Sequence, residues 1–264
     1  MSLAGVWKNS YGSTMSLSLV DQNLVAGTYK SSTGSTGTYE VIGYQTGHEP
    51  TSAAGQAAAL AIDWHSVVAG PPDNSWHWVS GLSGQLSIQN GIEQLVLAHS
   101  LVASVDFPGL AAAGTYIDKL IYQRVSTAPI EERPSAPGEG QGAAAADPLV
   151  GSWFAADGTA LLISSVVPYS GNAFGWVLGK LIWKGSTSLL YGMTDINAQS
   201  AGLTKQSVSI VSLPSDQGGP ALSFSGTLDL GSGILTMLEL QSQSTAPANS
   251  YLETQVSSLE LSKR

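Results

Sequence analysis

The chain carries the same opening twice. Residues 5–19 read GVWKNSYGSTMSLSL and residues 151–163 read GSWFAADGTALLI. Each copy begins with Gly-x-Trp and places a Gly five residues after the Trp, followed by a hydroxyl residue and an apolar run. Two further pairs of segments recur in the same order, WVSGLSGQL (78–86) with SFSGTLDL (223–230) and TYIDKLIYQ (115–123) with SYLETQVSS (250–258). This internal duplication predicts two domains that share one fold.

The segment between the two copies differs from both. Residues 126–148, STAPIEERPSAPGEGQGAAAADP, contain four prolines, many small residues and mostly acidic charge. Such a composition is typical of an extended or flexible linker. We therefore expect a first domain over 1–125, a linker over 126–148 and a diverged second domain over 149–264.

Short strands are the expected elements of both copies. In TMSLSLV (14–20) every second residue is apolar, and in LAIDW (60–64) Leu60, Ile62 and Trp64 share a face while Asp63 and His65 point the other way. Turn signals such as DQN (21–23) and QNG (89–91) separate the runs. Many short consecutive strands predict an all-β protein of antiparallel up-and-down barrels, which leave no exposed sheet edge.

One predicted strand is apolar on both faces. In IEQLVLAHSLVASV (92–105), Leu95, Leu97 and Leu101 lie on one face and Val96, Ala98 and Val102 on the other. A barrel strand with one wet face alternates instead. We expect the two barrels to pack together through this strand and its equivalent GILTMLELQ (233–241); a covering loop is the alternative.

Composition narrows the classes of partner and site. The net charge is −9 and there is no cysteine. The sequence offers no basic patch for nucleic acid or for an anionic membrane surface, and no thiol for a disulfide or a zinc site. The start MSLAGVWKN has no signal-peptide pattern. A cytoplasmic location is expected, although removal of a signal peptide would leave the same mature sequence, so secretion stays open.

No motif of metal, cofactor or nucleophilic chemistry is present, so we expect neither a metal nor a cofactor. The histidines His48, His65, His77 and His99 all lie in the first half, without metal-site spacing. We expect them at the surface or at an interface. A pairing of His77 with Asp63 or Asp118 for acid–base chemistry has no motif behind it.

The first half resembles the avidin and streptavidin family. GVWKNSYGST is similar to the family's Gly-x-Trp-x-Asn-x-x-Gly-Ser, and GTYKSSTG (27–34) to its Gly-Thr-Tyr-x-Ser. AIDW ends on a Trp as a family strand does, and WVSGLSGQ (78–85) is similar to its aromatic-x-Gly-Gln stretch. The resemblance covers most of residues 4–125 and implies two tandem avidin-like barrels, the second one diverged.

The resemblance also implies a ligand site at one mouth of the first barrel. By matching positions, Asn9, Ser13 and Tyr29 would contact a ureido oxygen, Ser31 a ureido nitrogen, and Ser35 the carboxylate end. Trp64 would form an apolar wall, and Ser75 and Trp78 would add wall and tail contacts. Ser100 stands where the family has a tryptophan. Asp118 lies one pleat from Leu120, which holds the place of the family's nitrogen-binding side chain.

These features predict a small-molecule-binding protein with its pocket in the first barrel, for biotin or another hydrophobic ring compound. The second copy carries Ala155 in place of Asn9, and at the place of Tyr29 it offers Trp176 or Leu178. The second barrel is then a scaffold or partner, or binds something apolar. Barrel pairing within the chain would make a pseudo-dimer, and a further homo-oligomer stays open.

An enzyme is the alternative class. A barrel that lacks some tryptophan walls but keeps polar donors has room for a bulkier hydrophobic metabolite. Asn9 and Tyr29 would then stabilise a developing oxyanion in a cofactor-independent cyclisation or isomerisation.

Overall fold

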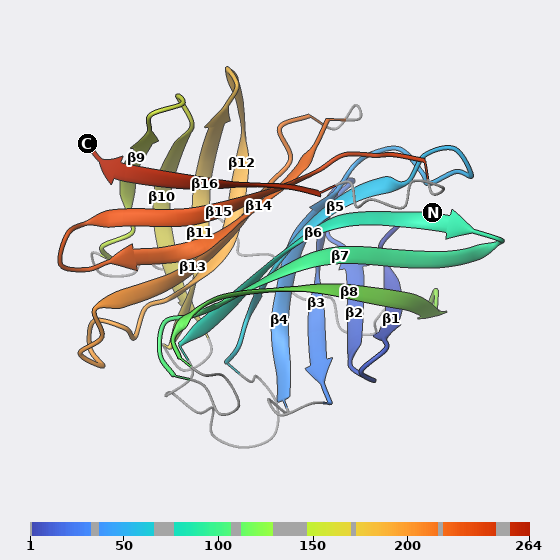
Figure 1. Ribbon diagram of the computed structural model, residues 1–264, viewed down its shortest axis with the longest axis horizontal. Coiled ribbons are helices and arrows are strands. Elements are labelled where there is room, and N and C mark those ends of the chain that lie inside the picture. Colours follow the sequence, from blue (N-terminus) through green and yellow to red (C-terminus); the bar gives the residue numbers. More distant parts are fainter. Residues whose placement is uncertain are drawn as a thin grey trace.

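The protein is an all-β molecule of two closed antiparallel barrels, each with eight strands (Figure 1). The computed structural model describes residues 2–32, 37–65, 77–106, 112–128, 147–169, 173–215, 219–246 and 254–264. Within this part of the chain no helix is long and apolar enough to cross a membrane.

The first barrel follows the chain order without a crossover. Its strands are β1 (Gly5–Asn9), β2 (Thr14–Leu19), β3 (Leu24–Ser31), β4 (Gly37–Gln45), β5 (Gln56–Asp63), β6 (Trp78–Gln89), β7 (Ile92–Ala103) and β8 (Gly114–Ser126). Strand β8 returns to pair with β1 and closes the sheet.

The second barrel repeats this arrangement. Its strands are β9 (Gly151–Ala155), β10 (Ala160–Tyr169), β11 (Phe174–Trp183), β12 (Ser186–Asp195), β13 (Lys205–Ser212), β14 (Ala221–Asp229), β15 (Ile234–Ser242) and β16 (Thr254–Lys263). Strand β16 closes it against β9.

The two barrels share one hydrogen-bonding register. In the first, Gly5 pairs with Leu17 and Leu17 with Gly27; in the second, Gly151 pairs with Ile163 and Ile163 with Gly179. A Cβ on Gly27 or on Gly179 would collide with the backbone of the preceding strand, which explains a glycine at both places. Each residue of one barrel therefore has a definite counterpart in the other.

A buried tryptophan closes the same end of each barrel. The indole Nε1 of Trp7 donates to the Leu3 carbonyl at 2.8 Å, and that of Trp153 donates to the Leu149 carbonyl at 2.7 Å. A cation covers each ring: Arg124 Cζ lies 4.1 Å from the Trp7 centroid and Lys263 Nζ lies 5.4 Å from that of Trp153. These contacts explain why Gly-x-Trp survives in both copies.

The barrels pack through the outer faces of β5 and β6 against β13 and β14. Small side chains let the sheets approach closely: Gly81 faces Ser223 and Ser225, and a Cβ on Gly81 would lie 2.7 Å from Ser223 Oγ. Serine hydroxyls bridge the barrels, for example from Ser209 Oγ to the Ser80 carbonyl at 2.9 Å. These hydrogen bonds give buried carbonyl and hydroxyl groups a partner, which the neighbouring alanine side chains cannot provide.

The prediction that β7 and β15 would form this contact is only partly right. Ser100 and Val102 of β7 reach the interface, but Val96 and Ala98 stay partly exposed. The strands that precede β7 and β15 carry most of the contact, because their outer faces consist of small residues that another sheet can approach.

Three histidines lie at the interface, as expected. His77 Nδ1 contacts Asp195 Oδ2 of the second barrel at 2.6 Å, and both side chains are buried. The His65 ring packs on Phe174 at 5.9 Å, and His48 Nε2 contacts Ser244 Oγ at 2.6 Å. His77 is therefore not paired with Asp63 or Asp118, and Asp63 instead accepts from the Tyr169 hydroxyl.

Candidate functional site

The interior of the first barrel holds several of the residues that the sequence singled out. Tyr29, Trp64 and Trp78 belong to its interior cluster. Asn9 follows buried Trp7 by two positions and so shares its inward face. Within the described chain no group of His, Asp and Glu has the arrangement of a metal site.

Asn9 is held in place by the turn that follows it. Its Oδ1 accepts the backbone N–H groups of Tyr11 at 3.1 Å and Ser13 at 2.9 Å. The backbone N–H of Ser32 in turn donates to Ser13 Oγ at 3.1 Å, so the hydroxyl ties the turn to the end of β3. The amide therefore has a fixed direction, and its Nδ2 is left to point into the barrel.

A second buried donor lies beside Asn9. Tyr122 of β8 pairs with Asn9 in the barrel ladder and is fully buried. Burial, reinforced by nearby Tyr29 and opposed by the adjacent Asn9 amide, raises the pKa of Tyr122, so its phenol keeps its proton at neutral pH. Neither Asn9 Nδ2 nor Tyr122 Oη has a hydrogen-bond partner among the described residues. Leaving such donors unpaired costs about 1–3 kcal/mol each.

Aromatic rings form one wall of the interior. Trp64 packs edge-on against Tyr29 with ring centroids 5.9 Å apart, and against Tyr39 at 4.9 Å. The indole Nε1 of Trp64 donates to Ser80 Oγ at 2.8 Å, and Ser80 Oγ lies 2.7 Å from His99 Nε2. Because an indole can only donate, Ser80 accepts from Trp64; its hydroxyl can then donate to His99 Nε2 or accept from it, according to the tautomer of the ring.

His99 is a neutral imidazole in this chain of bonds. Desolvation lowers its pKa to about 4, against the opposing effect of the Asp118 carboxylate. Asp118 pairs with His99 in the ladder between β7 and β8, and its side chain is exposed. A ring that accepts from Ser80 at Nε2 carries its proton on Nδ1. The interior therefore presents a neutral base next to an accessible carboxylate.

Some predicted residues lie elsewhere. Ser100 faces the second barrel, where its Oγ is 2.9 Å from Ser225 Oγ, because alternation along β7 turns His99 rather than Ser100 inward. Ser100 is therefore not part of the interior cluster. Ser31 is buried at the end of β3. Ser35 and Ser75 lie outside the described residues.

Sequence reasoning missed four interior residues: Tyr39, Ser80, His99 and Tyr122. His99 was placed at the surface or an interface, although the apolar face of Leu95, Leu97 and Leu101 also contains it. Tyr122 lies one pleat from Leu120, the residue that the resemblance points to, and on the same face. Period-2 alternation was a sufficient signal for both residues.

The second barrel differs at the equivalent interior positions. By register, Ala155 replaces Asn9, Leu181 replaces Tyr29 and Leu261 replaces Tyr122. The expectation that Trp176 or Leu178 holds the place of Tyr29 is wrong. Both side chains belong to the cluster between the barrels. The pairing of Ile163 with Gly179 sets the register of β11 and puts Leu181 at the place of Tyr29.

A tryptophan occupies the interior of the second barrel. Trp183 stands in the place of Ser31, and its Nε1 donates to Glu239 Oε1 at 2.9 Å. Ser257 Oγ donates to the other oxygen, Oε2, at 3.2 Å. Glu239 holds the place of His99, so here the interior polar group is already bonded within the protein.

The sequence model of the avidin family matches residues 1–108. The first barrel is avidin-like. The match covers β1 to β7 and ends before β8, the strand that carries Asp118 and Tyr122. No curated protein matches the chain. At the level of the family, the match indicates a β-barrel that binds a small molecule. The second avidin-like barrel shares its topology and register.

Proposed function

We propose that the first avidin-like barrel binds a small ring compound, with biotin as the first candidate. The observation that carries this proposal is the pair of buried donors without acceptors, Asn9 Nδ2 and Tyr122 Oη. Both lie in the interior of the first barrel, although the family match covers Asn9 and ends before Tyr122. A ligand oxygen placed between them would satisfy both donors. The carbonyl of a ureido or lactam ring is a suitable acceptor.

The aromatic wall supports the same proposal. Trp64, Tyr29 and Tyr39 offer a flat apolar surface against which a ring would pack. The other side of the interior offers His99, a neutral acceptor–donor ring. Convergent polar groups on apolar walls are typical of a small-molecule site. Asp118 is less suited to biotin, because a free acid tail would meet a like charge.

Calorimetric titration with biotin tests the proposal. We expect Tyr122→Phe to weaken binding by about 1–2 kcal/mol, and Asn9→Ala to do the same, because each change removes one bond to the ligand oxygen. Ser257→Ala, at the equivalent of Asp118 in the second barrel, is the control and should leave the affinity unchanged. An unchanged affinity in both first-barrel variants would count against the site.

An enzyme is the second candidate, favoured by the Trp64–Ser80–His99 chain. When His99 Nε2 accepts from Ser80, Ser80 Oγ can take a proton from a bound substrate while it passes its own hydrogen to that nitrogen. Asn9 and Tyr29 would stabilise the oxyanion of a cyclisation or isomerisation of a hydrophobic metabolite. Incubation with polyene or quinone-methide precursors should then yield product. His99→Gln should stop turnover while leaving binding in place; equal rates with and without the protein would end this candidate for those substrates.

We further propose that barrel pairing within the chain replaces the pairing of two separate chains. The serine bonds and the His77–Asp195 contact join the two barrels. Sedimentation analysis should give the mass of a single chain. A larger mass would show that further copies assemble.

A further inference from the structure

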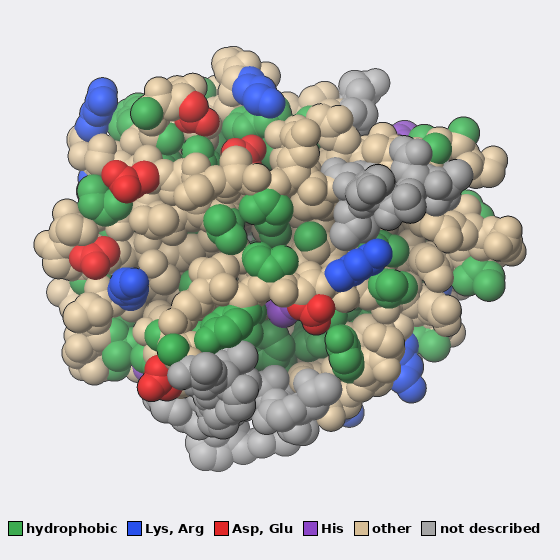
Figure 2. Space-filling model, viewed as in Figure 1, with side chains coloured by type: hydrophobic (Ala, Val, Ile, Leu, Met, Phe, Trp, Pro, Cys, Tyr) green, Lys and Arg blue, Asp and Glu red, His purple; other side chains and the backbone are tan. Residues whose placement is uncertain are grey.

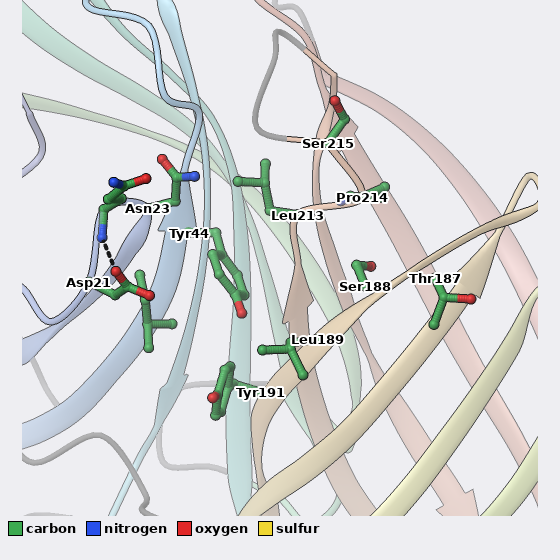
Figure 3. A pocket seen from close by; sticks show the side chains of 12 residues that line it. Asp21, Asn23, Tyr44, Thr187, Ser188, Leu189, Tyr191, Leu213, Pro214 and Ser215 are labelled. Atoms are coloured by element: carbon green, nitrogen blue, oxygen red, sulfur yellow. Dashed lines mark hydrogen bonds between the residues drawn. The ribbon is translucent and has the colours of Figure 1, made fainter.

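A groove lies between the two barrels, outside both interiors (Figure 3). Its volume is about 380 Å³, within the range of small-molecule sites. The turn Asp21–Asn23 and Tyr44 line it from the first barrel, and Leu189, Tyr191 and Leu213 line it from the second. The groove therefore depends on the packing of the two barrels against each other.

Two aromatic rings from different barrels meet in this groove. The ring centroids of Tyr44 and Tyr191 are 6.1 Å apart, with planes tilted by 45°. Tyr44 is buried and anchored among the residues between the barrels, whereas Leu189 beside it is 53% exposed. Leu189 and the two tyrosine rings therefore form an apolar surface on which an apolar group of a ligand can pack.

The charge of the groove is negative. Its lining includes one carboxylate, that of Asp21, and no Lys, Arg or His. Burial raises the pKa of Tyr44, and Tyr191 and Asp21 add to the effect, so the phenol stays neutral and lies within the field of the carboxylate. The chain as a whole carries a net charge of −9, which attracts cations and repels anions.

We propose that this groove is a second binding site, for an organic ammonium ion that carries an apolar group. The ammonium would lie over the tyrosine rings and next to Asp21, and the apolar group would pack on Leu189 and Leu213. Cations bind aromatic faces because the ring quadrupole is negative there. On the face shown in Figure 2, charged side chains are scattered as single residues. In the groove a single carboxylate is present, so the tyrosine rings supply the rest of the attraction for the cation.

Titration of the full chain with benzyltrimethylammonium, followed by NMR of the ligand, tests the proposal. Benzyl alcohol and phenylacetate serve as the neutral and anionic comparisons. We expect the cation to bind most tightly and its affinity to fall as salt is added. Saturating biotin should leave this affinity unchanged, because the groove is separate from the barrel interior. Competition by biotin would place the cation in the first barrel and overturn the proposal.

Three variants locate the site. Asp21 is exposed, and the Asp21→Asn variant should weaken binding of the cation by about fivefold. The Tyr191→Leu variant should weaken it by about tenfold. Glu260→Gln removes one exposed carboxylate from β16 and should change nothing. If Tyr191→Leu does not fold, Leu189→Ala takes its place. Full affinity in Asp21→Asn, or equal binding of benzyl alcohol, would show that the groove does not select a cation.

Discussion

The two barrels have the same frame but different interiors. Tyr122 and Asn9 of the first correspond to Leu261 and Ala155 of the second, both apolar. Ser31 corresponds to Trp183, which reaches Glu239 at the place of His99. The first interior therefore keeps buried donors without partners, whereas the interior polar contact of the second is closed within the protein.

This difference separates what a barrel needs from what a ligand site needs. The tryptophan plug and the strand glycines recur because closure and close strand packing demand them in either barrel. Unpaired buried donors destabilise a fold, so they persist where something other than the fold uses them. The comparison therefore fits the proposal that the first barrel holds the ligand site.

The largest expected effect tests the shared frame. Trp7→Ala and Trp153→Ala should each lower the free energy of unfolding by about 3–5 kcal/mol, because each removes a fully packed indole. Denaturant unfolding followed by fluorescence measures both. Leu19→Ala, at an exposed position, is the control. A large loss in one barrel and a small loss in the other would show that the frames are not equivalent.

The next effect is a pH dependence of stability that comes from His99 in the first barrel. The pKa of His99 is lowered to about 4, below its usual 6.5. Between these values the unfolded chain binds a proton that the folded chain does not, so stability falls as the pH drops from 6.5 toward 4, by at most about 3 kcal/mol. In His99→Gln this contribution disappears. Unfolding curves across this pH range measure it, and the same pH slope in both proteins would contradict it.

Glu239→Ala tests the second interior. It leaves the buried Trp183 Nε1 without its acceptor and should cost about 2 kcal/mol of stability. Biotin affinity should not change, because the proposed ligand site is in the other barrel. Thermal unfolding and calorimetry give the two values. A loss of affinity as large as that of Tyr122→Phe would place the site in the second barrel.

The smallest effect has the opposite sign. Tyr122→Phe removes a buried hydroxyl that has no partner among the described residues. The ligand-free protein should be as stable as the parent or more stable by about 1 kcal/mol, although it binds ligand less well. Loss of stability would mean that the hydroxyl is bonded within the protein.

The sequence by itself determined the repeat, the strands and the barrel topology that both domains share. Gly-x-Trp, the turn residues and the alternation of apolar side chains are local signals, because each depends on the burial and backbone conformation of one strand or turn. The resemblance to the avidin family, and not these local signals, placed Asn9 and Tyr29 in one interior. The same alternation contained His99 and Tyr122, but nothing local showed that these residues would meet Ser80 and Asn9 from other strands.

Only the tertiary structure decided what the outer faces contact and which polar atoms stay unpaired. The sequence predicts contact through β7, which is apolar on both faces, but the alanine and glycine faces of β5 and β6 allow a closer approach of the second barrel. His77 contacts Asp195, which is 118 residues away in the sequence, and Tyr44 packs against Tyr191 at the groove. Such contacts depend on how two closed barrels fit together, which is a property of their surfaces and not of any one segment.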